Sequence, residues 1–231
     1  MAAKPSPSQL AFDLELPPHF GRDDFLAAPP NQNALALIET WPRWPDELLF
    51  LLGPAGSGKS HLAAIWAAKA DAEIVAAKDI ASTDLRGLLA RPGLVIEDAD
   101  KLVSEAPLFH LINLAREGGI SILLTARQRP ELWGLATADL LSRLRLAPVA
   151  ELGAPNEALL EAVLVKLFCD RQLVVDANVI EYIARHIDRS LDLARGIVAQ
   201  LDREGLVQGR KVTRAMARDL LQRLQLGDDE A

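Results

Sequence analysis

The chain has 231 residues, half of them hydrophobic, and a formal net charge of −7 at pH 7. Residues 1–150 carry a net charge of −4 and the remainder −3, so neither part has the basic excess of a typical DNA-binding module. No apolar run approaches the roughly 20 residues of a membrane span, and the amino terminus lacks a signal-peptide pattern. Cys169 is the single cysteine, which excludes a disulfide framework. We expect a soluble, cytoplasmic protein with a protein partner, and no direct binding to DNA or membranes.

Residues 1–47 are rich in proline and weak in periodic pattern, which predicts an arm rather than a packed unit. From residue 48 onward, strand-like runs alternate with helical ones. This alternation predicts a parallel sheet with helices on both faces. The expected strands are Leu48–Leu52, Ile74–Ala77, Leu94–Ile96, Ile120–Thr125 and Leu146–Ala150, and the expected helices span residues 60–70, 80–90, 104–118 and 137–143.

The segment after the first expected strand fits the phosphate-loop pattern G-x-x-x-x-G-K-[ST] at every fixed position. Its three glycines let successive backbone N–H groups turn inward around phosphates. Lys59 is expected to reach the β- and γ-phosphates, and the Ser60 hydroxyl to hold Mg²⁺. The segment therefore predicts binding of ATP or ADP, through Gly53, Pro54, Ala55, Gly56, Ser57, Gly58, Lys59, Ser60 and His61.

A second acidic segment, Leu94-Val95-Ile96-Glu97-Asp98, predicts the other half of a nucleotide-hydrolysis site. Three apolar residues lead to two carboxylates at the carboxyl edge of a parallel sheet, where ligands of such sheets bind. We expect Glu97 and Asp98 to be catalytic, with Glu97 as a Mg²⁺ ligand. The usual motif begins with Asp, and the extra methylene of Glu97 predicts poorer metal geometry and slow hydrolysis.

No strand pattern remains after Pro155. Four amphipathic helices are expected at Pro155–Arg171, Asp176–His186, Ser190–Glu204 and Thr213–Leu224, with Ser190 and Thr213 as N-caps. A nucleotide-binding sheet followed by a helical bundle is the architecture of AAA+ proteins. The predicted fold class is therefore α/β, with a five-stranded AAA+ base domain at residues 21–153, a helical lid at 154–231, and an arm at 1–20.

The chain resembles the AAA+ portion of the bacterial replication initiator DnaA and, more closely, the short DnaA-related regulators of the Hda type. The resemblance covers nearly the whole chain and rests on the phosphate loop, the acidic strand end, the Leu-Leu-Ser-Arg-Leu stretch at 140–144 and the Asn-x-Asn-Ala-Leu segment at 31–35. It implies that Arg143 is an arginine finger that acts in trans on a neighbouring site. It also implies that Asn31 and Asn33, with the preceding Asp24-Phe25, help to enclose the nucleotide base.

Two features favour the short regulators over the initiator. Beyond its lid, DnaA continues into a basic helix-turn-helix domain, whereas this sequence stops at residue 231, and we expect it to lack that domain. The segment from Gln9 to Leu14 resembles the peptide by which bacterial proteins bind the DNA polymerase III sliding clamp (β). There Leu10, Phe12 and Leu14 are expected to enter an apolar groove, while Gln9 makes hydrogen bonds.

The chain also departs from the family pattern. Ala126-Arg127 stands where DnaA-like chains have a polar Ser-Asp pair, so a sensor contact with the γ-phosphate is not expected there. In the lid, Asp192 occupies the usual sensor position, and Arg195 or Arg189 is the expected substitute. Together with Glu97, these changes predict a molecule that holds its nucleotide and has at most weak ATPase activity of its own.

The leading hypothesis is a negative regulator of replication initiation that binds the sliding clamp and promotes hydrolysis of DnaA-bound ATP through Arg143. The sequence does not determine the oligomeric state, and a homo-oligomer is one alternative. One alternative function is that of an AAA+ helicase loader or transposition helper, which would need an intact acidic motif and basic residues that bind single-stranded DNA. The other is that of a stand-alone P-loop kinase, which would need acceptor-binding residues within the sheet domain.

Overall fold

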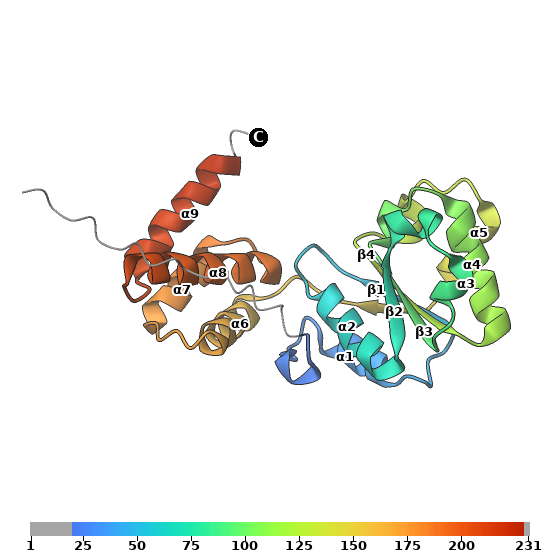
Figure 1. Ribbon diagram of the computed structural model, residues 1–231, viewed down its shortest axis with the longest axis horizontal. Helices are drawn as coiled ribbons and strands as arrows, with labels where there is room; N and C mark the ends of the chain where they lie inside the picture. Colours follow the sequence, from blue (N-terminus) through green and yellow to red (C-terminus); the bar gives the residue numbers. More distant parts are fainter. Residues whose placement is uncertain (1–19, 229–231) are drawn as a thin grey trace, which may run out of the picture. The chain divides into compact units, whose positions relative to one another are not determined.

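The computed structural model describes residues 20–228. They form two compact units, Phe20–Asn156 and the described residues from Glu157 onward. The first, called the base unit below, contains a sheet with helices, and the second, called the helical unit, contains only helices (Figure 1). The predicted combination of an α/β domain with a carboxyl-terminal helical region is therefore confirmed.

The base unit is built on a parallel five-stranded sheet with the strand order β2-β3-β4-β1-β5. Strands β1, β3 and β4 lie at its centre and are almost wholly buried, as expected for continuous apolar runs covered on both faces. The order places the residues that follow β1 and β3 on either side of those that follow β4. The strands are β1 (Leu48–Leu52), β2 (Ala72–Ala76), β3 (Gly93–Glu97), β4 (Ser121–Ala126) and β5 (Val149–Glu151).

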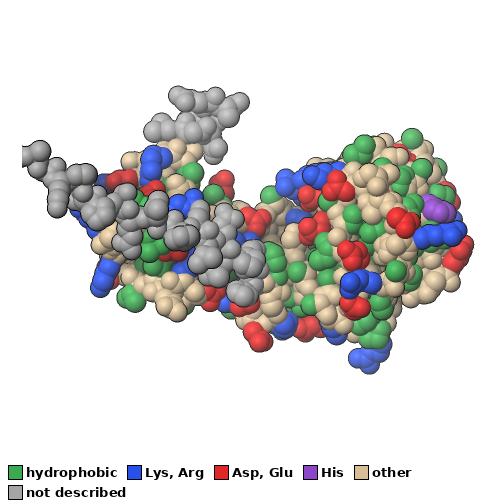
Figure 2. Space-filling view, viewed as in Figure 1, with side chains coloured by type: hydrophobic (Ala, Val, Ile, Leu, Met, Phe, Trp, Pro, Cys, Tyr) green, Lys and Arg blue, Asp and Glu red, His purple; other side chains and the backbone are tan. Residues whose placement is uncertain are grey.

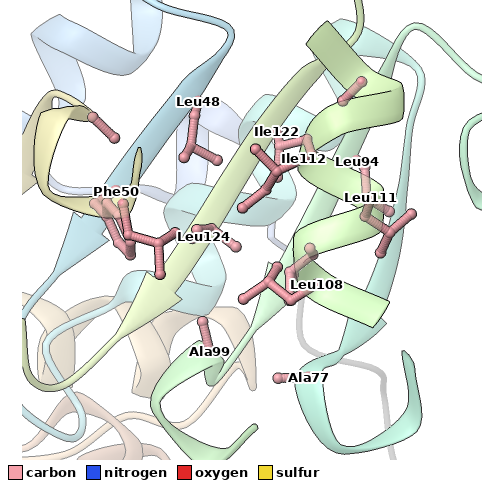
Figure 3. Packing of buried hydrophobic residues seen from close by; sticks show 14 of the residues in the cluster. Leu48, Phe50, Ala77, Leu94, Ala99, Leu108, Leu111, Ile112, Ile122 and Leu124 are labelled. Atoms are coloured by element: carbon pink, nitrogen blue, oxygen red, sulfur yellow. The ribbon is translucent and has the colours of Figure 1, made fainter. Parts of the chain in front are cut away.

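Alternate side chains along the strands enter two separate apolar cores, one on each face of the sheet. On one face, Leu48, Phe50 and Leu124 pack in a cluster that includes Leu108 and Ile112 of α4 (Figure 3). On the other, the intervening strand residues pack against α1 and α2. The helices of this unit are α1 (Gln32–Glu39), α2 (Lys59–Ala70), α3 (Leu85–Leu88), α4 (Glu105–Gly118) and α5 (Ala138–Leu146), with short 3₁₀ turns η1 (Arg22–Asp24), η2 (Ala77–Ser82), η3 (Ala99–Lys101) and η4 (Pro130–Leu132).

The prediction that residues 1–47 form an unpacked arm is wrong for residues 20–47. Helix α1 buries Ala34, Leu35 and Ile38 in the core that also contains α2. The two tryptophans that follow it belong to the same core: Trp44 stacks on Trp66 with ring centroids 4.8 Å apart, and Trp41 meets Trp66 edge-on. The sequence did not predict this helix, because it is only eight residues long and is flanked by prolines, which are typical of loops.

The helix expected at 80–90 is also wrong as a single element. The chain forms η2 and then the four-residue helix α3, with a break at Thr83 and Asp84. Asp84 is extended, and its carboxylate accepts a hydrogen bond from the backbone N–H of Arg86 at 3.1 Å. It therefore acts as the N-cap of a new helix and interrupts the old one.

The helical unit confirms the four predicted helices, which are α6 (Glu157–Asp170), α7 (Ala177–His186), α8 (Leu191–Gln208) and α9 (Arg214–Asp228). They share one apolar core. Ser190 caps α8 by accepting from Leu193 N–H at 3.2 Å, and Thr213 accepts from Met216 N–H at 3.4 Å. Helix α8 continues past the predicted end at Glu204 until Gly209, whose positive φ of 59° ends it.

Candidate functional site

The phosphate-loop residues connect β1 to α2, as the sequence predicted. Gly56 and Gly58 have φ values of 65° and 96°, a conformation that side chains disfavour, and Gly58 precedes the first turn of α2. The loop is fixed to the sheet because the Gly53 N–H donates to the carbonyl oxygen of Ala126, the last residue of β4, at 3.2 Å. The loop is therefore held at the carboxyl edge of the central strands.

The polar groups inside this loop fit a bound phosphate. The Lys59 Nζ donates to the carbonyl oxygens of Gly53 and Pro54, at 2.8 Å each. The hydroxyl of Ser57 is buried and has no hydrogen-bond partner among the described residues. A buried hydroxyl without a partner is costly, and a phosphate oxygen would supply the missing acceptor. Ser60, the expected Mg²⁺ ligand, is exposed at the second position of α2.

The acidic pair lies where β3 ends. Glu97 is the last residue of the strand, and Asp98 adopts a left-handed conformation with φ of 53°. The Asp98 N–H donates to the buried Thr125 hydroxyl at 3.0 Å, and its carboxylate pairs with Lys101 at 2.8 Å. The strand order thus brings the acids and the phosphate loop to one edge on opposite sides of β4. Sequence reasoning missed Thr125, which an apolar strand pattern does not single out.

The segment after β4 carries the departure from the family pattern. Arg127 is exposed, and its backbone N–H donates to the Asp100 carboxylate at 3.0 Å. The second carboxylate oxygen of Asp100 is buried without a partner in the described part of the chain. Asp100 therefore fixes the backbone at the position where DnaA-like chains have a polar Ser-Asp pair, and sequence reasoning did not single it out.

The three residues expected near the nucleotide, Asn31, Asn33 and His61, differ from one another in burial and in their contacts. Asn31 is buried, and its side-chain amide bonds to the backbone of Leu26 and Ala28, so it closes the turn before α1. Asn33 is exposed on α1. The His61 ring contacts Phe20 and Phe25, with centroids 5.2 Å apart in each case, and its Nε2 lies 3.1 Å from the carbonyl oxygen of Gly21. Residues 20–25 therefore pack beside the first turn of α2.

Arg143 lies on α5 and is held against α4. Its guanidinium donates to the Asn113 side chain, pairs with Asp139 at 3.0 Å, and lies 5.0 Å above the ring of Phe109. About 30% of its side chain is exposed. Sequence reasoning singled out Arg143 and missed Phe109 and Asn113, whose spacing of four on α4 is the only signal for them.

The two arginines predicted as lid sensors lie in the helical unit. Arg195 pairs with Asp192 one turn earlier on α8, at 3.3 Å, and Arg189 is exposed before that helix. The expected clamp-binding residues Gln9, Leu10, Phe12 and Leu14 lie outside the described residues. Within residues 20–228, no group of three or more His, Cys, Asp or Glu side chains is placed to hold a metal ion. In the same range, no helix is long and apolar enough to cross a membrane.

Comparison with known proteins shows that the chain is similar in sequence to a DnaA protein. No family model matches the chain. The replication initiator DnaA of Bacteroides thetaiotaomicron is 22% identical over 94% of this chain, and the chain spans about half (52%) of that protein's length.

Solved structures show the same fold. Domain III of DnaA from Thermotoga maritima matches with a TM-score of 0.74 and 22% identity, over 89% of this chain and 96% of that one. AMPPCP-bound DnaA from Aquifex aeolicus matches with a TM-score of 0.66 and 17% identity, over 81% and 66%. The Holliday junction branch migration motor RuvB from Thermotoga maritima matches with a TM-score of 0.61 and 18% identity, over 82% and 66%. The chain therefore has the AAA+ fold, and over almost its whole length it is similar to DnaA.

Proposed function

We propose that the chain is a nucleotide-holding AAA+ regulator of replication initiation that acts on DnaA-bound ATP through Arg143. The phosphate loop carries the first part of the proposal, because its buried Ser57 hydroxyl, its lysine and its positive-φ glycines form a cradle for phosphates. The AMPPCP-bound DnaA structure, which shares the fold, gives the same indication.

ADP or ATP would be held by the loop, with Lys59 on the terminal phosphates and the Ser60 hydroxyl and Glu97 at a Mg²⁺ ion. The ion would neutralise phosphate charge. Two features favour holding over turnover: the Asp98 carboxylate is paired with Lys101, and Arg127 replaces a polar sensor residue. We therefore expect weak hydrolysis by the chain itself.

Arg143 carries the regulatory part of the proposal. A residue that acts on another molecule's site must already be held in place before that molecule binds. The guanidinium has five N–H donors, and two of them make side-chain hydrogen bonds within the described chain, to Asn113 and Asp139. The others can serve an incoming phosphate. The Arg143 side chain is thus held against α4 while about 30% of it stays exposed.

The clamp would supply the association with DNA. On the face of the base unit seen in Figure 2, acidic and basic side chains are interspersed, and the chain as a whole is acidic. Such a surface does not favour direct contact with a phosphate backbone. A clamp-binding segment at residues 9–14 removes the need for one.

The test is the rate of hydrolysis of DnaA-bound ATP with this protein, with and without DNA-loaded sliding clamp. We expect clamp-dependent acceleration that Arg143→Ala removes, since arginine fingers contribute roughly 10³–10⁵ in rate. Arg145→Ala is the matched control. Arg145 lies on the same helix but is 56% exposed and paired with Glu131 at 2.9 Å, so its loss should leave the stimulation intact.

Two further outcomes separate the parts of the proposal. The double variant Leu10→Ala, Phe12→Ala should lose clamp binding and stimulation while nucleotide binding persists, whereas Ser6→Ala with Ser8→Ala should retain all three. Unchanged clamp affinity in the first variant would contradict the tether. Stimulation that survives Arg143→Ala would make Arg143 an ordinary surface residue, and an absence of both stimulation and clamp binding in the wild type would favour a helicase loader or kinase.

A further inference from the structure

The start of α5, the helix that carries Arg143, is hydrogen-bonded to α4. Thr137 is the N-cap residue of α5, yet its side chain makes no capping bond within the helix. Instead, Glu105, the first residue of α4, binds the backbone just before the helix. Its two carboxylate oxygens accept from the backbone N–H groups of Ala136 at 2.7 Å and Thr137 at 2.8 Å.

The charge of Glu105 suits this contact. The Thr137 hydroxyl, followed by the two backbone N–H groups, holds the pKa of Glu105 below its usual value, so the carboxylate is ionised at neutral pH. A negative charge at the start of a helix is also favoured by the helix dipole. The contact therefore joins two elements that are 32 residues apart in the sequence by charge-assisted hydrogen bonds.

The same row of α4 also holds Arg143. Glu105, Phe109 and Asn113 are spaced by four and therefore share one face of the helix. Glu105 holds the start of α5, while Phe109 and Asn113 contact the Arg143 guanidinium six residues further along. At 1.5 Å per residue, these two attachments lie about 9 Å apart along α5.

We propose that Glu105 is the positioning residue for Arg143. Its carboxylate fixes where α5 begins and, through that, where the guanidinium lies on α4. Without it, the N-cap residue of α5 loses its attachment to α4 and the first turn frays. This turn contains Asp139, the ion-pair partner of Arg143. Arg143 would then keep its chemistry but lose its place. The functional consequence rests on the proposed function of Arg143.

The test compares Glu105→Ala and Glu105→Gln with the wild-type protein in the stimulation of DnaA-bound ATP hydrolysis. At saturating regulator, Glu105→Ala should lower the maximal rate by roughly 10- to 100-fold, the loss expected for a misplaced catalytic group. The half-saturating concentration should change much less. Glu105→Gln keeps one acceptor oxygen and should be intermediate.

Asp84→Ala is the matched control for a loss of stability alone. Asp84 holds the start of another helix of the base unit, α3, but within the described chain it makes no hydrogen bond or ion pair with α4, α5 or Arg143. Asp84→Ala should keep full stimulation at a similar loss of stability. An equal loss of stimulation in both variants, or full stimulation in Glu105→Ala, would overturn the proposal.

A second readout does not depend on the proposed function. In ¹⁵N-arginine-labelled protein, the Arg143 Nε–H signal, assigned by its absence from Arg143→Ala, should show the ring-current shift of a group above Phe109. Glu105→Ala should move it towards the free-arginine position, and Asp84→Ala should not. If the wild-type protein fails to stimulate hydrolysis, the proposed function fails, and this signal alone decides whether Glu105 positions Arg143. An unmoved signal in Glu105→Ala refutes the positioning role.

Discussion

A single added methyl group at Gly53 tests whether the phosphate loop owes its shape to close packing. A Cβ at this position would lie 2.7 Å from the Leu152 carbonyl oxygen and 2.8 Å from the Ser57 hydroxyl oxygen. Both distances are well inside van der Waals contact. The Leu152 backbone cannot yield easily, because its N–H donates to the Leu52 carbonyl oxygen at 2.7 Å and the residue is buried. The loop must therefore move.

We expect Gly53→Ala to lower the free energy of unfolding of the base unit by about 1–3 kcal/mol, the usual cost of overpacking. Displacement of the loop should also weaken ATP and ADP binding by about tenfold or more, since each factor of ten corresponds to about 1.4 kcal/mol. Gly153→Ala is the matched control. It lies next to Leu152, its added Cβ would meet nothing closer than 3.5 Å, and it should behave as the wild type.

The four tryptophans, which are Trp41, Trp44, Trp66 and Trp133, all lie in the base unit, so urea unfolding followed by tryptophan fluorescence reports on that unit. Titration with a fluorescent ADP analogue measures the affinity. If Gly53→Ala unfolds at the wild-type urea concentration and binds nucleotide as tightly, the close packing of the loop has no energetic consequence and the reasoning is refuted.

Two further changes test other attachments. Thr125→Val removes the buried hydroxyl that accepts from the Asp98 N–H, and it should cost the base unit about 1–3 kcal/mol in the same fluorescence assay; an unchanged midpoint would show that water replaces the hydroxyl. Ser190→Ala removes the α8 cap and should destabilise the helical unit by about 0.5–2 kcal/mol, visible in amide exchange of α8. The tryptophan signal should stay unchanged, and faster exchange confined to the base unit would contradict the assignment of the cap.

The parts of the fold that follow from local patterns could be predicted from the sequence. The phosphate loop and its flanking strand and helix are contained in adjacent residues, and the central strands are continuous apolar runs. Helix α1 could not be predicted, because its apolar face is short and proline-flanked, and its stability comes from packing in the core with α2. The break at Asp84 was missed because a capping aspartate and a mid-helix aspartate look alike until the backbone conformation is known.

In the candidate site, the sequence likewise predicted the functional residues but not the residues that hold them in place. Glu97 and Lys59 were predicted from residue type and spacing, and the base unit places both at one edge of the sheet. Arg143 was predicted only from the resemblance to the DnaA family. Their supports were not identified: Thr125 is 27 residues from Asp98, and Asn113 is 30 from Arg143. Contacts at such separations depend on strand order and helix packing, which a single sequence does not fix.

Glu105 offers a cleaner test of how Arg143 acts than a change of Arg143 itself. A variant of Arg143 removes both the chemistry and the contacts with α4, so its loss of activity cannot separate the two. A variant of Glu105 leaves the guanidinium and both its α4 partners in the chain and removes the contact between the first turn of α4 and the start of α5. If Arg143 acted merely as a mobile positive charge, its effect would survive that change, because attraction between exposed charges depends weakly on position. An arginine that must donate specific hydrogen bonds to a phosphate in a neighbouring site would not tolerate it, since such catalysis depends on placement within about 0.5 Å. The response to Glu105 variants therefore distinguishes a catalytic finger from a simple electrostatic contact.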